Sequence, residues 1–221
     1  MAVAALFSAG KDSALAALLL DPFYDVVLCH CTFGVDADSP SVDAPGVDDP
    51  APPTGGDEVA ARAADALGFP VGTVDLDRSV ADDAVERMVA DGYPREGIQQ
   101  VHEHALEAVA GRERLAGRAV TAVADGTRRD DRVPAVDRSV ARSLEDRHGV
   151  DYVRPLAGYG RGAVDDLVAR CLAVETGPSE RLATADYETE LRALMAAEYG
   201  PETVAAVFPA HTQSRVAGHR E

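Results

Sequence analysis

The sequence predicts an α/β protein with a five-stranded parallel sheet between two layers of helices, in a three-layer αβα arrangement. One observation is that short apolar segments alternate with longer helical segments over residues 1–175. Because parallel neighbours need a crossover connection, this alternation predicts right-handed strand–helix–strand units. A second observation is that glycine-containing loops follow the first and fourth apolar segments. With the strand order 3-2-1-4-5, both loops lie at the carboxyl edge of the sheet, where its order reverses.

The individual elements follow from hydrophobic periodicity. The expected strands are short runs rich in Ala, Val, Leu and Cys, at residues 2–7, 25–33, 70–76, 118–124 and 150–156. Such continuous apolar runs are typical of strands that are buried on both faces. Apolar residues at helical spacing predict helices at residues 14–20, 58–67, 79–90, 96–109, 136–147 and 163–174.

Two segments depart from this alternation. Residues 34–57 are rich in Asp, Pro and Gly without periodicity, which predicts a mobile acidic loop. After residue 176 the pattern predicts helices only, ending in a polar tail that contains His211 and Arg215. The expected organisation is therefore an α/β domain over residues 1–175 and a helical extension over residues 176–221.

The first glycine-containing loop holds the only lysine of the chain, Lys11, whereas the other twenty basic residues are arginines. It reads Ser8-Ala9-Gly10-Lys11-Asp12-Ser13 and joins the first strand to the first helix. A turn of this kind presents free amide groups and the positive end of a helix to an anion. Gly10 allows close approach of a phosphate, Lys11 adds a positive charge, and Asp12 can cap the helix or hold a divalent cation. The loop is not a Walker A motif, because position 5 is alanine. A capped helix after a buried strand is the structural alternative.

The second loop, residues 125–131, reads Asp-Gly-Thr-Arg-Arg-Asp-Asp. Gly126 permits close approach, Thr127 can donate its hydroxyl, and an arginine at 128 or 129 can reach a phosphate. The carboxylates of Asp125, Asp130 and Asp131 can orient a ribose or hold Mg²⁺. An ordinary turn followed by solvated charges is the alternative for this segment.

The loop of residues 8–13 resembles the Ser-Gly-Gly-x-Asp-Ser signature of the PP-loop ATP pyrophosphatases, with Ala9 in place of its first glycine. Together with Asp125-Gly126-Thr127 and the strand alternation, it makes residues 1–175 similar to the PP-loop members of the adenine nucleotide alpha hydrolase-like superfamily, whose fold is Rossmann-like. The second loop, with Asp130-Asp131, is similar to that of sulfur-inserting members. The short chain with its C-terminal extension resembles archaeal proteins described as predicted subunits of a tRNA 2-thiouridylation enzyme.

This resemblance implies an ATP pyrophosphatase that adenylates a substrate oxygen and releases pyrophosphate, with ATP and Mg²⁺ bound and tRNA as the acceptor. It implies catalytic roles for Lys11, Asp12 and Asp125, and Mg²⁺ coordination by Asp12 and Asp130. The residues implied to bind the nucleotide are Phe7, Ser8, Ala9, Gly10, Lys11, Ser13, Thr32, Phe33, Gly126, Thr127 and Arg128.

Two other functions stay open at this point. One is a diphthamide-type ATP-dependent amide ligase, since such enzymes also carry a lysine in this loop. The other is a non-catalytic nucleotide-binding module of the universal stress protein type. The intact Lys11-Asp12-Ser13 set favours an enzyme, because a pure binding module has less need of it.

The composition says more about the cellular environment of the protein than about its function. The net charge of −17 is typical of a halophilic protein, and in a salty cytosol screening makes net charge a poor guide to partners. No run of eighteen apolar residues and no apolar leader is present, so we expect a cytoplasmic protein without membrane contact. Oligomeric state does not follow from the sequence.

Several smaller features keep two interpretations. Cys29 and Cys31 point to one face of a strand, either as small core residues or as reactive thiols. Eight arginines against six acidic residues between Arg128 and Arg161 indicate either a nucleic-acid contact or ordinary ion pairing. The polar tail either folds back to cover the nucleotide or bind the acceptor substrate, or it frays.

Overall fold

The computed structural model describes residues 1–35, 55–179 and 181–220. Its main sheet contains the five expected parallel strands in the order β3-β2-β1-β5-β6, which confirms the predicted arrangement. A short strand, β4, pairs antiparallel with β5 at the sheet edge and was not expected. The strands are β1 (Ala2–Leu6), β2 (Asp25–Thr32), β3 (Val71–Asp75), β4 (Arg114–Leu115), β5 (Arg118–Ala124) and β6 (Asp151–Val153).

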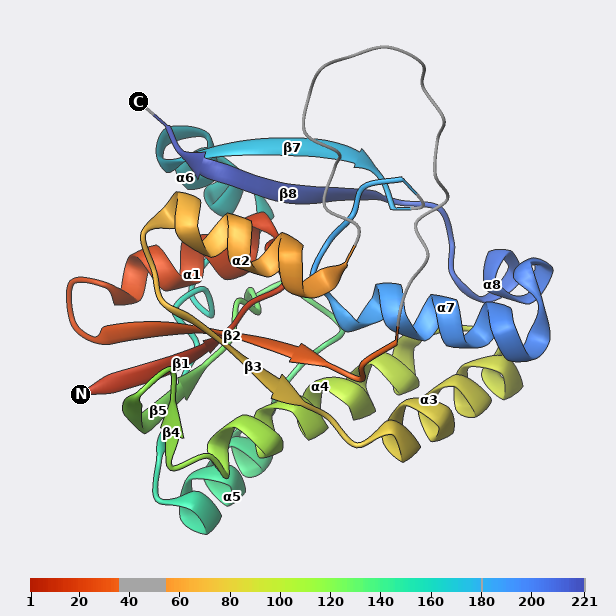
Figure 1. The fold of residues 1–221 in the computed structure, drawn as a ribbon, viewed down its shortest axis with the longest axis horizontal. Coiled ribbons are helices and arrows are strands. Elements are labelled where there is room, and N and C mark those ends of the chain that lie inside the picture. The colour runs from red at the N-terminus through yellow and green to blue at the C-terminus, as the bar shows by residue number, and fades with distance from the viewer. Residues whose placement is uncertain (36–54, 180, 221) are drawn as a thin grey trace.

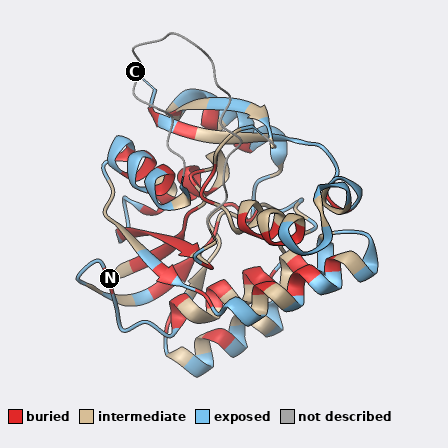
Figure 2. Ribbon diagram, turned by 45° about the vertical axis from the view of Figure 1, so that its right-hand side comes forward, coloured by how far each residue is buried: buried red, intermediate tan, exposed pale blue. Residues whose placement is uncertain are grey.

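Helices cover both faces of this sheet, as Figure 1 shows. One layer contains α1 (Lys11–Leu20), α2 (Gly56–Leu67) and α6 (Arg161–Cys171), and the other contains α3 (Arg78–Asp91), α4 (Arg95–Ala110), α5 (Arg138–His148) and α7 (Tyr187–Tyr199). Alternate residues of β1 divide between the two apolar cores, with Val3 and Ala5 facing α1 and Ala4 and Leu6 facing α4. The central strands are buried on both sides, which explains their unbroken apolar sequences (Figure 2).

The C-terminal part differs from the expectation of helices alone. It contains α7 and α8 (Pro201–Val207), but also β7 (Leu172–Pro178) and β8 (Thr212–His219), which pair antiparallel. The tail is thus a strand rather than a frayed end, and β7 begins where the last helix of the α/β part was expected to continue. The cause is a pairing between segments that lie about forty residues apart, which local periodicity does not reveal. The division at residue 175 falls within β7 and stays a prediction.

Two further expectations concern the acidic loop and the absence of membrane contact. The acidic loop predicted over residues 34–57 lies mostly outside the described residues, which resume at Gly55. Among the described helices, none is long and apolar enough to cross a membrane.

Candidate functional site

The two glycine-containing loops meet at the carboxyl edge of the sheet. β1 and β5 are neighbours in the sheet, so the turns that follow them leave the same edge. Gly126 lies directly against the start of α1: a Cβ atom placed on it would be 2.8 Å from Ser13 N and 2.9 Å from the carbonyl carbon of Asp12. Only glycine fits at this distance from another backbone. The close approach predicted for the two loops is therefore present.

The loop of residues 8–13 is held in its shape by its own serines and by an uncommon backbone conformation. Ser8 Oγ accepts a hydrogen bond from Gly10 N (3.3 Å) and lies 3.3 Å from Ser13 Oγ. Ala9 has a φ of 58°, in the left-handed region that favours glycine. This is the position at which the resembling signature carries glycine, and here a fully buried alanine takes the same conformation.

The C-terminal segments fasten this loop from outside. Ala9 O accepts a hydrogen bond from Val216 N (2.8 Å), and Ser8 O accepts one from Ala185 N (3.0 Å). At the start of α1, Lys11 N donates to Ser214 Oγ (3.3 Å). The polar tail therefore folds back onto the loop, as one of its two interpretations expected.

Charged side chains surround the same turn. Lys11 Nζ donates to Asp12 (2.8 Å) and to Asp165 on α6 (2.9 Å). Arg128 lies 3.3 Å from Asp12 and also pairs with Asp131. The pKa of Arg128 is raised, because its pairing with three carboxylates outweighs the effect of its partial burial. Carboxylates thus hold the side chains of Lys11 and Arg128 at the loop, and a bound polyphosphate would compete with these carboxylates for the two cations.

Two adjoining cavities open on the loop and share Ser8, Asp12, Ser13 and Asp186. The first, of about 280 Å³, has a largely apolar lining from the ends of β1 and β2 and from α4, including Leu6, Phe7 and Ile98. The second, of about 240 Å³, is lined by polar and charged side chains, in which the cations of Lys11, Arg128 and Arg161 outnumber the carboxylates of Asp12 and Asp186. The loop therefore borders an apolar compartment on one side and a cationic one on the other.

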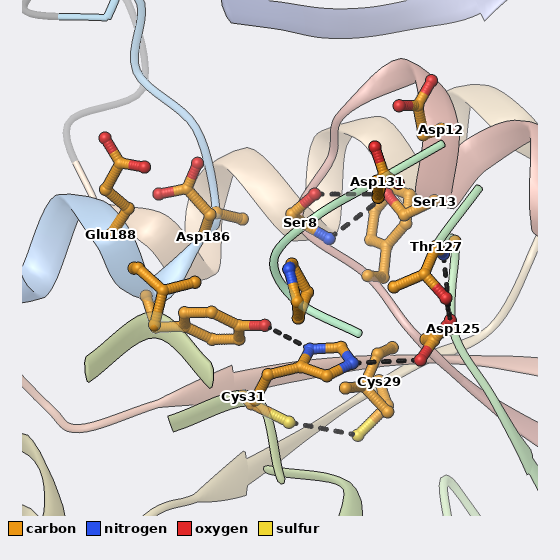
Figure 3. Close-up of a pocket in the computed structure, with 18 of the residues that line it drawn as sticks. Ser8, Asp12, Ser13, Cys29, Cys31, Asp125, Thr127, Asp131, Asp186 and Glu188 are labelled. Carbon is orange, nitrogen blue, oxygen red and sulfur yellow. Dashed lines mark hydrogen bonds and ion pairs between the residues drawn. The ribbon is translucent and has the colours of Figure 1, made fainter. Parts of the chain in front are cut away.

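A buried polar network forms one wall of the apolar cavity (Figure 3). The Oδ2 atom of Asp125 lies 3.0 Å from His102 Nε2 and accepts a hydrogen bond from Tyr152 Oη (2.6 Å). Its Oδ1 atom accepts from Thr127 N (2.9 Å) and Thr127 Oγ1 (2.6 Å). Burial by itself raises the pKa of Asp125, but these donors outweigh it and lower the pKa to about 2. Tyr187 Oη lies 2.6 Å from the other ring nitrogen, His102 Nδ1.

The thiols of Cys29 and Cys31 belong to the same wall, with their sulfur atoms 3.9 Å apart. Both side chains are buried. The contact with Cys31 and the burial together raise the pKa of Cys29, so its thiol stays protonated. Across the cavity, burial raises the pKa of Glu188.

Some expected site residues are placed elsewhere. Thr32 Oγ1 and Phe33 N both donate to the buried carboxylate of Glu190 on α7 (2.7 and 3.0 Å), and neither residue lines the two cavities described above. The side chain at the end of β2 that does line the apolar cavity is Cys31. Glu190 holds the end of β2, a contact between elements that no local pattern indicates.

The expected Mg²⁺ ligands do not form a ready-made metal site. Asp130 accepts a hydrogen bond from Arg161 N (3.0 Å), which places its carboxylate at the start of α6. Asp12 pairs with Lys11 and Arg128. Over the described ranges, no group of three or more His, Cys, Asp or Glu side chains could hold a metal ion. Mg²⁺ commonly binds through one or two carboxylates together with phosphate oxygens of its substrate, so coordination by Asp12 and Asp130 stays a prediction.

The site also contains residues that the sequence did not single out for it. His102 and Tyr187 come from α4 and α7, and Arg161, Asp165 and Ser214 come from later parts of the chain. Arg161 had a signal as the last of the arginines noted between residues 128 and 161, and Ser214 had one as part of the polar tail. His102, Asp165 and Tyr187 are single polar residues in helices, and tertiary packing brings them to the loop.

Comparisons with known proteins agree with this arrangement over the whole chain. A curated relative, the "Uncharacterized protein MJ0690" of Methanocaldococcus jannaschii, is 35% identical over 219 residues, covering 99% of this chain and 96% of the relative. A crystal structure of a "predicted subunit of tRNA methyltransferase" from Methanocaldococcus jannaschii superposes with a TM-score of 0.79 at 33% identity, covering 100% of this chain and 98% of that one. The model of one protein family, described as a family of unknown function (DUF7411), matches residues 1–46 and 53–218. This chain therefore belongs to the DUF7411 family.

Proposed function

We propose that this protein binds ATP at the loop of residues 8–13 and transfers AMP to an oxygen of its substrate, releasing pyrophosphate, in a tRNA-modification enzyme. One observation carries the proposal: the loop lies between an apolar cavity and a cationic cavity that share Ser8, Asp12 and Ser13 of the loop, together with Asp186. A nucleoside triphosphate has two corresponding parts, an apolar base for the apolar cavity and a polyanionic triphosphate for the cationic cavity.

The apolar cavity supports binding of adenosine. It lies at the carboxyl ends of β1, β2 and β5, where open parallel sheets bind their ligands. Its volume of about 280 Å³ is close to that of known small-molecule pockets. Leu6 and Phe7 supply the apolar surface, and Gly126 and Thr127 close the opposite side.

The cationic cavity supports binding of the leaving pyrophosphate. The start of α1 contributes its positive dipole end and amide groups, because its cap residue, Gly10, makes no side-chain cap, although Lys11 N donates to Ser214 Oγ. Lys11, Arg128 and Arg161 neutralise the charge that develops on the leaving group. The protein then contributes mainly positioning and charge stabilisation, which is sufficient for displacement at the α-phosphorus.

The tRNA part of the proposal is supported by the name of the structural neighbour, a predicted subunit of a tRNA methyltransferase. That name also implies another small ligand, S-adenosylmethionine, which carries no phosphate. The cationic cavity beside the loop favours ATP, since S-adenosylmethionine offers Lys11, Arg128 and Arg161 a single carboxylate whereas ATP offers them a triphosphate.

The single lysine allows a sharp test of ATP binding. An acyl phosphate of ATP transfers its acyl group to an amine beside the phosphates, and the only amines of this chain are Lys11 and the α-amino group at the start of β1. We expect mass spectrometry to find the label on Lys11, with protection by ATP and not by S-adenosylmethionine. Labelling of the α-amino group alone, or protection by S-adenosylmethionine, contradicts the proposal.

Turnover distinguishes the remaining functions. We expect pyrophosphate release from ATP to rise with bulk tRNA and to fall in Lys11→Ala, with Lys11→Arg as the variant that keeps the charge. Tight ATP binding with release that stays at background indicates a binding module instead. Release that tRNA does not stimulate indicates another acceptor, as in an amide ligase.

A further inference from the structure

Tyr187, His102 and Asp125 form a chain of hydrogen bonds that begins at the lining of the apolar cavity. We propose that Tyr187, His102 and Asp125 form a proton relay, in which Tyr187 accepts a proton from a nucleophile beside the bound nucleotide and passes its own proton to His102. The inference rests on the proposed function for the identity of the nucleophile, which attacks the adenylated substrate. The chain of hydrogen bonds itself is a property of the structure.

The direction follows from the charge of Asp125. Its carboxylate is ionised, with a pKa of about 2, and an ionised carboxylate only accepts hydrogen bonds. The nitrogen facing it at 3.0 Å, His102 Nε2, must therefore carry the hydrogen. In the neutral ring, His102 Nδ1 then has a free lone pair, and the hydroxyl of Tyr187 donates to it over 2.6 Å. Each proton thus points from the cavity toward Asp125.

The outer end of this chain belongs to the cavity. Tyr187 and His102 both line it, next to Asp186 and Glu188 from the start of α7. The Tyr187 oxygen still has lone pairs with which to accept a hydrogen bond from a ligand. Burial raises the pKa of Tyr187, so the resting group is a neutral phenol. It loses its proton only when His102 takes it, as a serine does beside a histidine and an aspartate.

The need to pair the buried carboxylate of Asp125 does not by itself explain why His102 lies beside it. Asp125 already accepts two hydrogen bonds from Thr127 on Oδ1 and one from Tyr152 on Oδ2. His102 is an additional donor with a buried ring of its own to be satisfied. The other titratable groups near Tyr187, Cys31 on β2 and Asp186 before α7, are thiol and carboxyl groups and not cations. Neither of these two groups is positively charged, so neither repels a proton that moves onto the ring.

The chemical step balances without a further reactant. As the nucleophile X–H attacks the adenylated carbon, the bond from X to carbon forms and the bond from carbon to the AMP oxygen breaks. The proton of X–H moves to Tyr187 Oη, and the phenolic proton moves to His102 Nδ1. The resulting imidazolium is paired with Asp125. When AMP leaves, the proton returns to water through Tyr187, and the neutral tautomer is restored.

The relay can be tested without the natural substrate, through the reactivity of Tyr187 toward a small aryl sulfonyl fluoride. Such reagents modify phenols that a neighbouring base deprotonates. We expect mass spectrometry to find Tyr187 modified faster than the exposed Tyr93 and Tyr199, which serve as internal references. His102→Gln keeps a donor toward Asp125 but has no basic nitrogen, and it should slow the reaction at least about 10-fold. His104→Gln is the matched control, since His104 lies on the same helix and contacts the backbone of Asp77 instead.

Two outcomes overturn the relay: Tyr187 that reacts no faster than the reference tyrosines, or equal rates in wild type and His102→Gln. Tyr187→Phe removes only the hydroxyl and gives a second measurement. It should lower tRNA-dependent turnover at saturating ATP about 100-fold, and unchanged turnover also overturns the relay. Failure of the proposed function is visible separately, as absent ATP binding by the wild-type protein, and the sulfonylation rates still decide the relay in that case.

Discussion

Substituting Gly126 by alanine tests whether the contact between the two loops forms the site. The added methyl group would lie 2.8 Å from Ser13 N and 2.9 Å from Ser13 Cα. These are backbone atoms at the start of α1, so no side chain can rotate away. Restoring ordinary contact distances requires the two loops to separate by roughly 0.5–1 Å.

The expected cost follows from this displacement. Overpacking of this kind destabilises a protein by about 1–3 kcal/mol. At roughly 2–4 °C per kcal/mol for a chain of this size, the melting temperature should fall by about 2–12 °C. The separation also moves Ser13 relative to Gly126, and loss of one hydrogen bond to a phosphate costs about 1.5–3 kcal/mol. The Kd for ATP should therefore rise about 10- to 100-fold.

The assay is isothermal titration with ATP, combined with thermal melts at low and at molar KCl. Gly158→Ala is the control, because a Cβ atom at Gly158 meets nothing within 4 Å. Its ATP affinity and melting temperature should match those of the wild type. If Gly126→Ala binds ATP as tightly as Gly158→Ala, the contact between the loops does not form the nucleotide site, and the reasoning is refuted.

Three further predictions concern the same loop and its surroundings. The pKa of Asp125 is lower in the folded than in the unfolded protein, so its ionised form contributes about 2 kcal/mol to the free energy of unfolding above pH 4. This contribution is lost as the pH falls from about 4 to 2. The free energies of unfolding in urea of the wild type and of Asp125→Asn should therefore converge over that range. Ala9→Gly should change the free energy of unfolding by less than about 1 kcal/mol, whereas Ala9→Val, β-branched at a φ of 58°, should cost more than about 2 kcal/mol; equal effects would contradict the strained turn. Val216→Pro removes the N–H that Ala9 accepts and should weaken ATP binding more than Val216→Ala does, as measured by titration; equal affinities would separate the tail from the site.

The parts of the fold that sequence predicts well are those with a local cause. The strands at residues 2–7 and 118–124 are unbroken apolar runs, and each is found within a residue of its expected bounds. The loops after these strands carry glycine and aspartate, and the first also carries lysine. The strand order alone places the two loops side by side. Parallel strands and the reversal of their order then place Lys11 and Gly126 at one edge.

The parts that sequence does not predict depend on distant pairing. Strand β8 has a single buried apolar residue, Val216, and its partner strand lies about forty residues earlier. The histidine at position 102 looks like any polar residue in an amphipathic helix until β5 and α7 bring Asp125 and Tyr187 to it. Thr32 was expected at the nucleotide because it ends a strand, and a glutamate from α7 holds it instead.

The attachment of Val216 to Ala9 has a consequence for the way the protein is made. The strand that fastens the turn before α1 is synthesised about 200 residues after that turn. A nascent chain can assemble its parallel sheet early, as units often do during synthesis, yet the turn stays without its outer contact until β8 has been made. The order of synthesis thereby delays completion of the turn at residues 8–13 until β8 is present.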